Sequence, residues 1–167
     1  SSILDLAVVK SEPRIVTYKY ETLDMLDKLK QFLEIEKEDK IKLEMKISNK
    51  LPSVLYGDEA GIIKVVLYFF DLVSSILSKK NILLEIDNIK VGNFAKLRFK
   101  FITNDKSILN YVAEDKKTKK LKLKITNSIN YEIINNLLDK TNGNITIIKD
   151  KDNINLILSI NQRLISE

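Results

Sequence analysis

The stretch that decides the fold is KVVLYFFDLVSSIL, residues 64–77. It is one long apolar run that contains a single carboxylate, Asp71. A helix with apolar side chains on every side is typical of a buried core helix. The run therefore predicts a central helix over 58–78, with Asp58 as its N-cap. The alternative interpretation is a helix that once carried polar ligands for a group now lost.

The composition is that of an ordinary folded domain. The 167 residues are 44% apolar and 31% charged, which is enough for one domain with a substantial core. The sequence has no cysteine and no histidine, which excludes disulfides, thiolate chemistry and histidine bases or ligands. The net charge of +5 comes mostly from lysine, so we expect no nucleic-acid partner. No apolar run is long enough for a membrane helix, so we expect no membrane contact.

Hydrophobic periodicity predicts an α+β fold. We expect a two-layer sandwich, with a mixed sheet of about five strands and about three helices on one face. The expected strands are 14–21, 41–48, 81–90, 95–103, 144–149 and 153–160, and the expected helices begin near 22, 58 and 128. Residues 1–13 read as the end of a helix and a linker, and 14–163 as one domain, so we interpret the chain as a piece of a longer protein.

Several local signals refine this prediction. Thr22 is the expected cap of the first helix, and Gly92-Asn93 the expected turn of a hairpin. Asn142-Gly143 is expected to end the last helix. The predicted apolar stripes of the first and last helices are Leu26, Leu29, Phe32 and Leu33, and Ile129, Ile133, Leu137 and Leu138.

Residues 104–127 differ from the rest of the chain. They are polar, lysine-rich and free of glycine and proline, which predicts a mobile or extended excursion. Leu121, Leu123 and Ile125 alternate with lysines, so a short strand is an alternative. Such a strand could add an edge to the sheet, cover an empty pocket or present a basic face to an acidic partner. The candidate docking lysines are Lys116, Lys117, Lys119, Lys120, Lys122 and Lys124.

The order of elements and several phrases resemble the catalytic, ATP-binding domain of sensor histidine kinases, the Bergerat-type ATPase fold. ILDLAVVKSEPRIVTYKYETLDML, residues 3–26, looks like the end of a dimerisation helix running into that domain. LPSVLYGDEAGIIKVVLYFF, residues 51–70, is similar to the family's "LP…GD…RL.QVL.NLL". The resemblance implies that 104–127 corresponds to the ATP lid.

The positions that carry the family's chemistry are different here. The long helix of active members carries asparagines that face the nucleotide and hold magnesium. By resemblance, Tyr68 stands at the first asparagine, Leu72 at the magnesium-binding one and Ser75 at a lysine. Magnesium needs hard oxygen ligands, and leucine supplies none. We therefore expect no metal site.

Both glycine boxes of the family are also missing. By resemblance, Thr103 replaces the adenine-binding aspartate, and Asp105 and Ser107 replace glycines of the first box. In the second box Thr126, Ser128 and Asn130 stand at glycines. Because a phosphate cradle needs close backbone approach, we expect no ATP or other cofactor.

The resemblance implies a degenerate domain in two-component signalling, inactive alone and acting by protein docking. The implied partners are its own dimerisation helices, a response-regulator receiver domain or another histidine kinase, in a homodimeric cytoplasmic parent protein. One alternative is a divergent but active histidine autokinase that binds ATP and magnesium. Another is an adaptor or nucleic-acid-binding module that shares only the fold.

Overall fold

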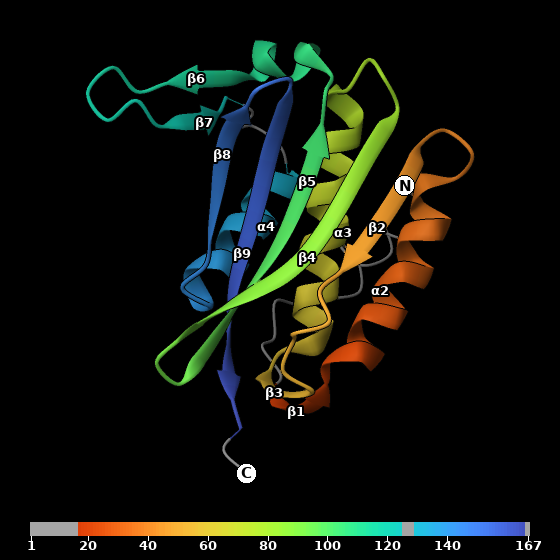
Figure 1. Cartoon of the computed structure of the whole chain (residues 1–167), viewed down its shortest axis with the longest axis vertical. Helices are drawn as coiled ribbons and strands as arrows, with labels where there is room; N and C mark the ends of the chain where they lie inside the picture. Colours follow the sequence, from red (N-terminus) through yellow and green to blue (C-terminus); the bar gives the residue numbers. More distant parts are fainter. Residues whose placement is uncertain (1–16, 125–128, 166–167) are drawn as a thin grey trace.

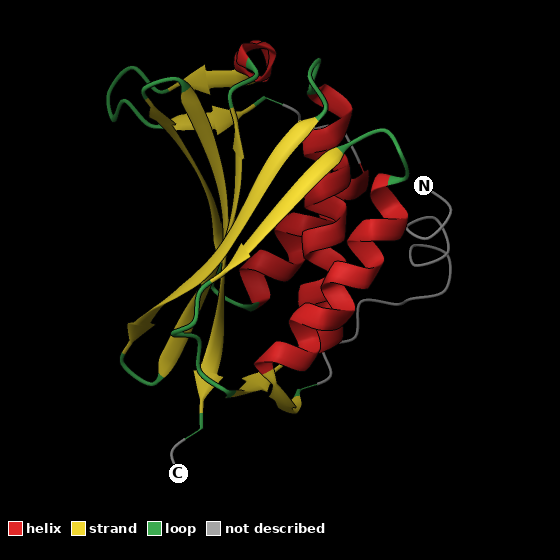
Figure 2. Cartoon of the chain, turned by 45° about the vertical axis from the view of Figure 1, so that its right-hand side comes forward, coloured by secondary structure: helices red, strands yellow, loops and turns green. Residues whose placement is uncertain are grey.

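The computed structural model describes residues 17–124 and 129–165. In this part of the chain one sheet forms one layer and the helices form the other (Figures 1 and 2). All three α-helices of the described residues lie on the same face of the sheet, as Figure 2 shows edge-on. This confirms the expected two-layer α+β sandwich. The expected helix end at 1–13 lies outside the described residues.

The sheet is mixed and larger than expected. Its main path runs β2-β4-β5-β9-β8-β7-β6, and β3 joins β9 to β1. The pair β2 and β4 is parallel, and the other pairs are antiparallel. The strands are β1 (Tyr18–Glu21), β2 (Lys42–Ile47), β3 (Val54–Gly57), β4 (Asn81–Val91), β5 (Phe94–Thr103), β6 (Val112–Glu114), β7 (Leu121–Leu123), β8 (Asn144–Asp150) and β9 (Asn153–Leu164).

The expectation of about five strands was therefore too low, because the sheet has nine. The strands β3 and β6 were not predicted, and β7 was predicted only as an alternative; the three have four, three and three residues. A segment this short shows at most one cycle of alternation, which periodicity does not resolve. Pairing with longer neighbours, such as β3 with β9, supplies the stability that the pattern lacks.

The central helix is α3 (Glu59–Ile76), which lies between α2 (Thr22–Lys37) and α4 (Ile129–Lys140) (Figure 1). Because it has a helix on each side and the sheet beneath, most of its residues are buried. This explains why its sequence is apolar all round. Asp58 caps α3 as predicted, since its Oδ1 accepts a hydrogen bond from the Gly61 N–H at 2.8 Å.

Three local predictions on α2 and α4 were wrong. The helix α2 begins at Thr22, but its N-cap is Glu21, and the Thr22 hydroxyl is buried with no hydrogen-bond partner among the described residues. Phe32 is 38% exposed, outside the buried stripe. On α4, Ile129 is 64% exposed and the unpredicted Ile134 is fully buried. Periodicity marks an apolar face to within about one position, and the neighbouring elements decide which residues are covered.

Both predicted turn signals were confirmed. Gly92 has φ +60° at the tip of the β4–β5 hairpin. Asn142 has φ 51° after α4, and the Gly143 N–H bonds to the Leu138 carbonyl at 2.7 Å, a Schellman-type ending. A Cβ on Gly143 would lie 2.4 Å from the Ser159 carbonyl oxygen, so only glycine fits there.

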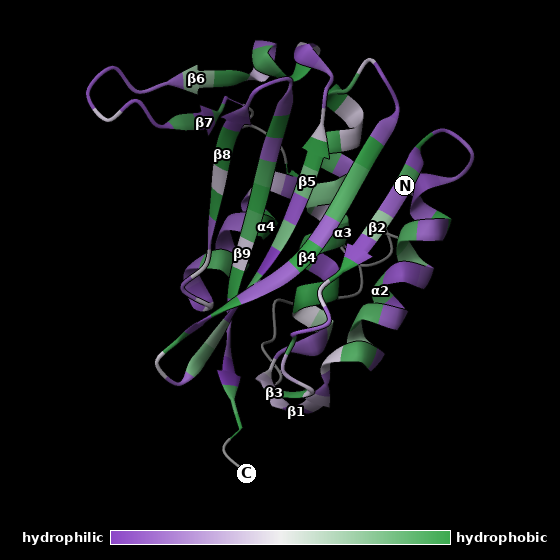
Figure 3. Ribbon diagram, in the orientation of Figure 1, coloured by the Kyte–Doolittle hydropathy of each residue, from purple (hydrophilic) through white to green (hydrophobic). Residues whose placement is uncertain are grey.

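The core lies between the helices and the inner face of the sheet. Hydrophobic and hydrophilic residues alternate along β4 and β5, as Figure 3 shows, with the hydrophobic set facing the helices. Phe69 of α3 meets Phe101 of β5 edge to face, with ring centroids 5.2 Å apart. The sheet's other face carries no helix of the described residues (Figure 2). The candidate functional site is the C-terminal half of α3 and the segments around it, because the resemblance places the nucleotide-facing positions there.

Candidate functional site

The family-equivalent positions on α3 are occupied by packed side chains. Tyr68 is fully buried and Leu72 is 5% exposed. The exposed Ser75 donates its hydroxyl hydrogen to the Leu72 carbonyl at 2.7 Å. None of the three presents a free carboxylate or amide oxygen, so this face of α3 does not fit a magnesium ion.

The lone carboxylate of α3 is used in a helix–helix contact. Asn130 at the start of α4 donates a hydrogen bond from Nδ2 to Asp71 Oδ2 at 3.0 Å. The prediction marked both residues, one as an isolated carboxylate and the other as a glycine-box position. It did not pair them, because they are 59 residues apart. Ser128 and Thr126 lie outside the described residues.

The positions of the first glycine box are tied to the loop that follows α3. Asp105 Oδ2 accepts a hydrogen bond from the Lys79 N–H at 2.5 Å, and Oδ1 accepts one from the Ser107 N–H at 3.0 Å. The Ser107 hydroxyl accepts a bond from the Ser78 N–H at 3.2 Å. Thr103 Oγ1 accepts one from the Asp105 N–H at 3.0 Å. Thr103 and Asp105 are almost fully buried, so their polar atoms serve the fold.

The electrostatics of Asp105 agree with this structural role. Burial of the carboxyl raises its pKa, but the N–H groups of Lys79 and Ser107 outweigh burial and hold the pKa of Asp105 below its usual range. A charged carboxylate saturated by backbone donors stabilises a loop. In this geometry the acceptor oxygens already have partners, which leaves little capacity for an adenine amino group.

The described part of the segment that the resemblance equates with the ATP lid, residues 104–124, is extended, which is one of the two predicted forms. It begins with a 3₁₀ helix, η1 (Lys106–Tyr111), whose Ile108 is fully buried in the core. A hairpin of β6 and β7 follows, and Leu121 of β7 pairs with Ile147 of β8. The alternating strand was thus predicted correctly over 121–123, and its place is at the edge of the sheet. Ile125 lies outside the described residues.

The β6–β7 hairpin, whose sequence is rich in lysine, projects from the edge of the sheet (Figure 1). Asp115 Oδ1 accepts hydrogen bonds from the N–H groups of Lys117 and Thr118 at 2.8 and 3.2 Å, which fixes the turn. All six candidate lysines are exposed: Lys116, Lys117, Lys119, Lys120, Lys122 and Lys124. Their exposure agrees with a docking surface but identifies no partner.

Two features of this region gave little or no signal in the sequence. The donors at Ser78 and Lys79 are backbone groups, which no pattern of side chains reveals. The burial of Ile108 within a polar stretch gave only one weak signal, a single isoleucine and leucine pair at 108–109.

Within the described residues, no three carboxylates gather into a possible cation site.

The fold is similar to that of histidine kinase catalytic domains. The Acinetobacter baumannii histidine kinase AdeS is similar, with TM-score 0.60 and 13% identity over 95% of this chain and 73% of AdeS. The catalytic domain of the histidine kinase ThkA has TM-score 0.59 and 14% identity over 87% and 95% of the two chains. Full-length ShkA, solved with AMPPNP, has TM-score 0.65 and 12% identity, and the match spans 99% of this chain and 37% of ShkA.

At these identities the similarity establishes the fold, and function remains a matter for proposal. No protein-family model matches the sequence, and no curated protein matches it either. None of the helices in residues 17–124 and 129–165 is long and apolar enough to cross a membrane.

Proposed function

We propose that this domain is a degenerate histidine kinase catalytic domain that acts in two-component signalling by docking to other proteins. The observation that carries the proposal is the internal use of the nucleotide-equivalent positions. Tyr68 and Leu72 are buried, Asn130 bonds to Asp71, and the Asp105 carboxylate is saturated by backbone donors. Binding ATP in the usual way would require breaking these contacts.

Magnitudes support this reading. A micromolar nucleotide site is worth about −8 kcal/mol. Each buried polar group left without its partner costs about 1–3 kcal/mol. Opening the contacts of Asp71, Asp105 and Ser107 would remove several such terms, so most of the binding energy would be lost.

The proposed partners are those that the family resemblance implies, and the lysine hairpin is a candidate surface for binding them. We propose the protein's own dimerisation helices, a receiver domain or another histidine kinase as partners, in a homodimeric parent protein working in the cytoplasm. The exposed lysines of 116–124 offer one basic surface for such docking.

Thermal unfolding with and without millimolar ATP and magnesium tests the loss of the nucleotide site. We expect no shift in Tm. A ligand at 100 times its Kd would add about 2.7 kcal/mol and raise Tm by about 5–10 °C. ShkA, which was solved with AMPPNP, is the positive control for a shift on adding nucleotide. A shift of that size here would favour the alternative, a divergent active autokinase, which radiolabel transfer in the longer protein would then confirm.

A further inference from the structure

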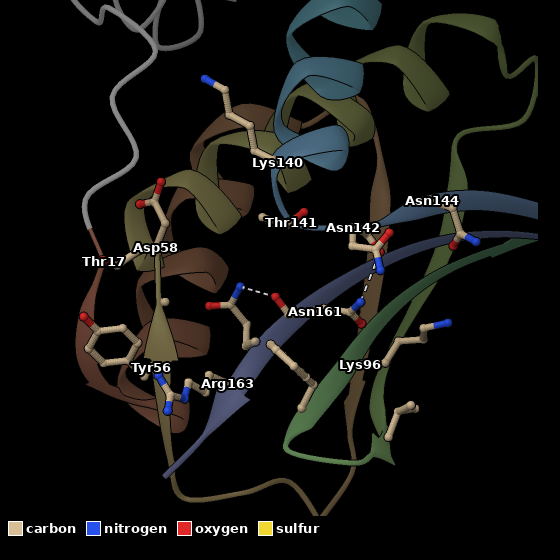
Figure 4. A pocket seen from close by; sticks show the side chains of 14 residues that line it. Thr17, Tyr56, Asp58, Lys96, Lys140, Thr141, Asn142, Asn144, Asn161 and Arg163 are labelled. Carbon is tan, nitrogen blue, oxygen red and sulfur yellow. Dashed lines mark hydrogen bonds between the residues drawn. The ribbon is translucent and has the colours of Figure 1, made fainter.

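A second feature lies at the opposite end of the sandwich, where the sheet has a gap. β9 pairs with β5 along one edge as far as Arg163. Along its other edge β8 ends opposite Ser159, and β3 begins opposite Arg163. No strand of residues 17–124 or 129–165 therefore pairs with 160–162 on that side. An open cleft of about 710 Å³ occupies the gap (Figure 4).

The floor of this cleft is held by hydrogen bonds. Gln162 is buried, accepts a bond from the Tyr20 hydroxyl at 2.9 Å and donates one to the Asn161 carbonyl at 2.7 Å. Asn161 Nδ2 donates to the Asn142 carbonyl at 3.1 Å. A Cβ on Gly57 would lie 1.8 Å from Gln162 Oε1, so a side chain there would displace the Gln162 amide. The cleft is thus preformed, which lowers the ordering cost of binding.

Exposed apolar side chains line one rim of the cleft. Phe94 is directly opposite Val91 in the β4–β5 hairpin and opposite Arg163 of β9, and Tyr56 of β3 is opposite Arg163 from the other side. Directly paired residues point to the same face, so these side chains form one row. Val91, Phe94 and Tyr56 are 54%, 47% and 40% exposed. Aromatic residues beside arginine are typical of interface hot spots.

The charges around the cleft are mostly positive. Lys96 of β5, Lys140 of α4 and Arg163 of β9 line it from three sides, as Figure 4 shows. Among the described residues none of these three makes an ion pair. Among the described residues that line the cleft, the only carboxylate is Asp58, which is buried and already bonded to the Gly61 N–H. Within this part of the chain the positive charge of the cleft therefore has no neutralising carboxylate.

We propose that this cleft docks an extended acidic peptide segment of a partner protein, with an apolar side chain against Phe94 and Tyr56. The cations extend from three separate elements and do not converge on one point (Figure 4), which suits a chain with several carboxylates better than a small anion. The peptide would cross the gap in the sheet beside residues 160–162. This inference gives a place and a chemistry to the proposed docking function.

The cleft is independent of the candidate nucleotide site. It lies at the N-terminal end of α3, beside Asp58, whereas Leu72 is on the other half of the helix. The rise of an α-helix places these two positions about 21 Å apart. Peptide binding and nucleotide binding can therefore succeed or fail separately, and a failed peptide experiment leaves the thermal test of the nucleotide site unaffected.

The probe is a fluorescein-labelled peptide of about ten residues, about 33 Å when extended, made of glutamate with two internal phenylalanines. Fluorescence anisotropy measures its Kd for the full chain. We expect binding that weakens as salt rises. A peptide with the same glutamates and alanine in place of phenylalanine should bind about tenfold more weakly, since it lacks the apolar anchor.

Variants locate the binding surface. Phe94→Ala and the double variant Lys140→Gln with Arg163→Gln should each weaken binding about tenfold. A second double variant, Lys120→Gln with Lys122→Gln, tests the lysine hairpin separately. The matched control is Lys30→Gln with Lys46→Gln, which removes the same charge from exposed positions outside both proposed docking surfaces. This control should leave the Kd unchanged. Thermal unfolding of each variant checks that the fold is intact.

The other outcomes overturn the proposal. Loss of binding only in the hairpin variant would assign acidic peptides to the lysine hairpin. Equal loss in the cleft double variant and in the Lys30→Gln, Lys46→Gln control would mean that net charge alone attracts the peptide. Absence of peptide binding by the natural chain would exclude a peptide-docking cleft.

Discussion

Asn130 of α4 donates a hydrogen bond to Asp71 of α3 over 3.0 Å, and this contact joins the two positions of most interest in the sequence. In the family resemblance one belongs to the nucleotide-facing helix and the other to a glycine box. Here the two side chains bond to each other. The contact makes both side chains part of the packing between α3 and α4, and it can be tested directly.

A double-mutant cycle on Asp71 and Asn130 measures that contact. Asp71→Ala and Asn130→Ala should each lower the free energy of unfolding by about 1 kcal/mol, with a coupling energy of about 0.5–1.5 kcal/mol, because each removes the other's partner. Urea unfolding gives these values. Asn136→Ala, at an exposed position of the same helix, is the control and should change stability by less than about 0.5 kcal/mol. A coupling energy of zero would contradict the contact.

An asparagine at position 72, the residue type that the resemblance expects there, should not restore a magnesium or nucleotide site. Leu72→Asn places an amide where the side chain is 5% exposed, so we expect a loss of about 2–4 kcal/mol in stability. No shift in Tm should appear on adding ATP and magnesium. Leu72→Met keeps the volume and should cost less than about 1.5 kcal/mol. Nucleotide binding by the asparagine variant would show that the pocket is still open.

The carboxylate of Asp105 should make stability depend on pH. Burial raises its pKa, but the N–H groups of Lys79 and Ser107 lower it further, so the net shift is downward. A depressed pKa in the folded state contributes stability that is present above the ordinary aspartate value of about 3.9 and is lost as pH falls through the folded pKa. The difference in unfolding free energy between the natural chain and Asp105→Asn should thus be constant from pH 7 to 5 and shrink at lower pH.

Chemical denaturation at several pH values measures this difference. The exposed Asp139→Asn on α4 is the control for a change of charge alone. A difference that stays the same down to pH 3, or that grows there, would mean that the charged form of Asp105 is not what holds the loop.

Gly143 and Gly92 should be needed for different reasons: a side chain would clash at Gly143, whereas the positive φ disfavours one at Gly92. At Gly143 an added Cβ would meet the Ser159 carbonyl oxygen at 2.4 Å and Leu138 Cδ2 at 2.8 Å. Gly143→Ala should therefore cost about 1–3 kcal/mol through forced displacement. At Gly92 nothing lies within 4 Å, and only φ +60° disfavours alanine. Gly92→Ala should cost about 1 kcal/mol, as thermal unfolding would show. A Gly143 variant as stable as the natural chain would contradict the close contact.

Burial of Ile108 should stabilise residues 104–124 more than the β6–β7 hairpin does. Ile108 is fully buried, so Ile108→Ala should cost about 2–4 kcal/mol. Leu121 is only half-buried at the edge of the sheet, and Leu121→Ala should cost less than about 1.5 kcal/mol. Urea unfolding compares the two. A larger loss for Leu121 would place the anchor in the hairpin.

The sequence alone determined the layered fold and its central helix. The reason is periodicity: an apolar run like 64–77 is stable only between other elements, and alternation in 81–90 and 95–103 specifies strands with one buried face. Local chemistry also identified Asp58, Gly92 and Gly143 at their turns and caps. These signals act within a few residues, so they need no knowledge of the rest of the chain.

Only the tertiary structure decided which polar side chains make hydrogen bonds across the fold and where the cleft lies. The pairing of Asn130 with Asp71, the backbone donors on Asp105 and the short strands β3, β6 and β7 all depend on contacts between distant segments. The cleft beside residues 160–162 exists because β8 ends before β3 begins along β9. Hydrogen bonds and gaps of this kind depend on where the folded chain brings groups together, and no local pattern encodes that position.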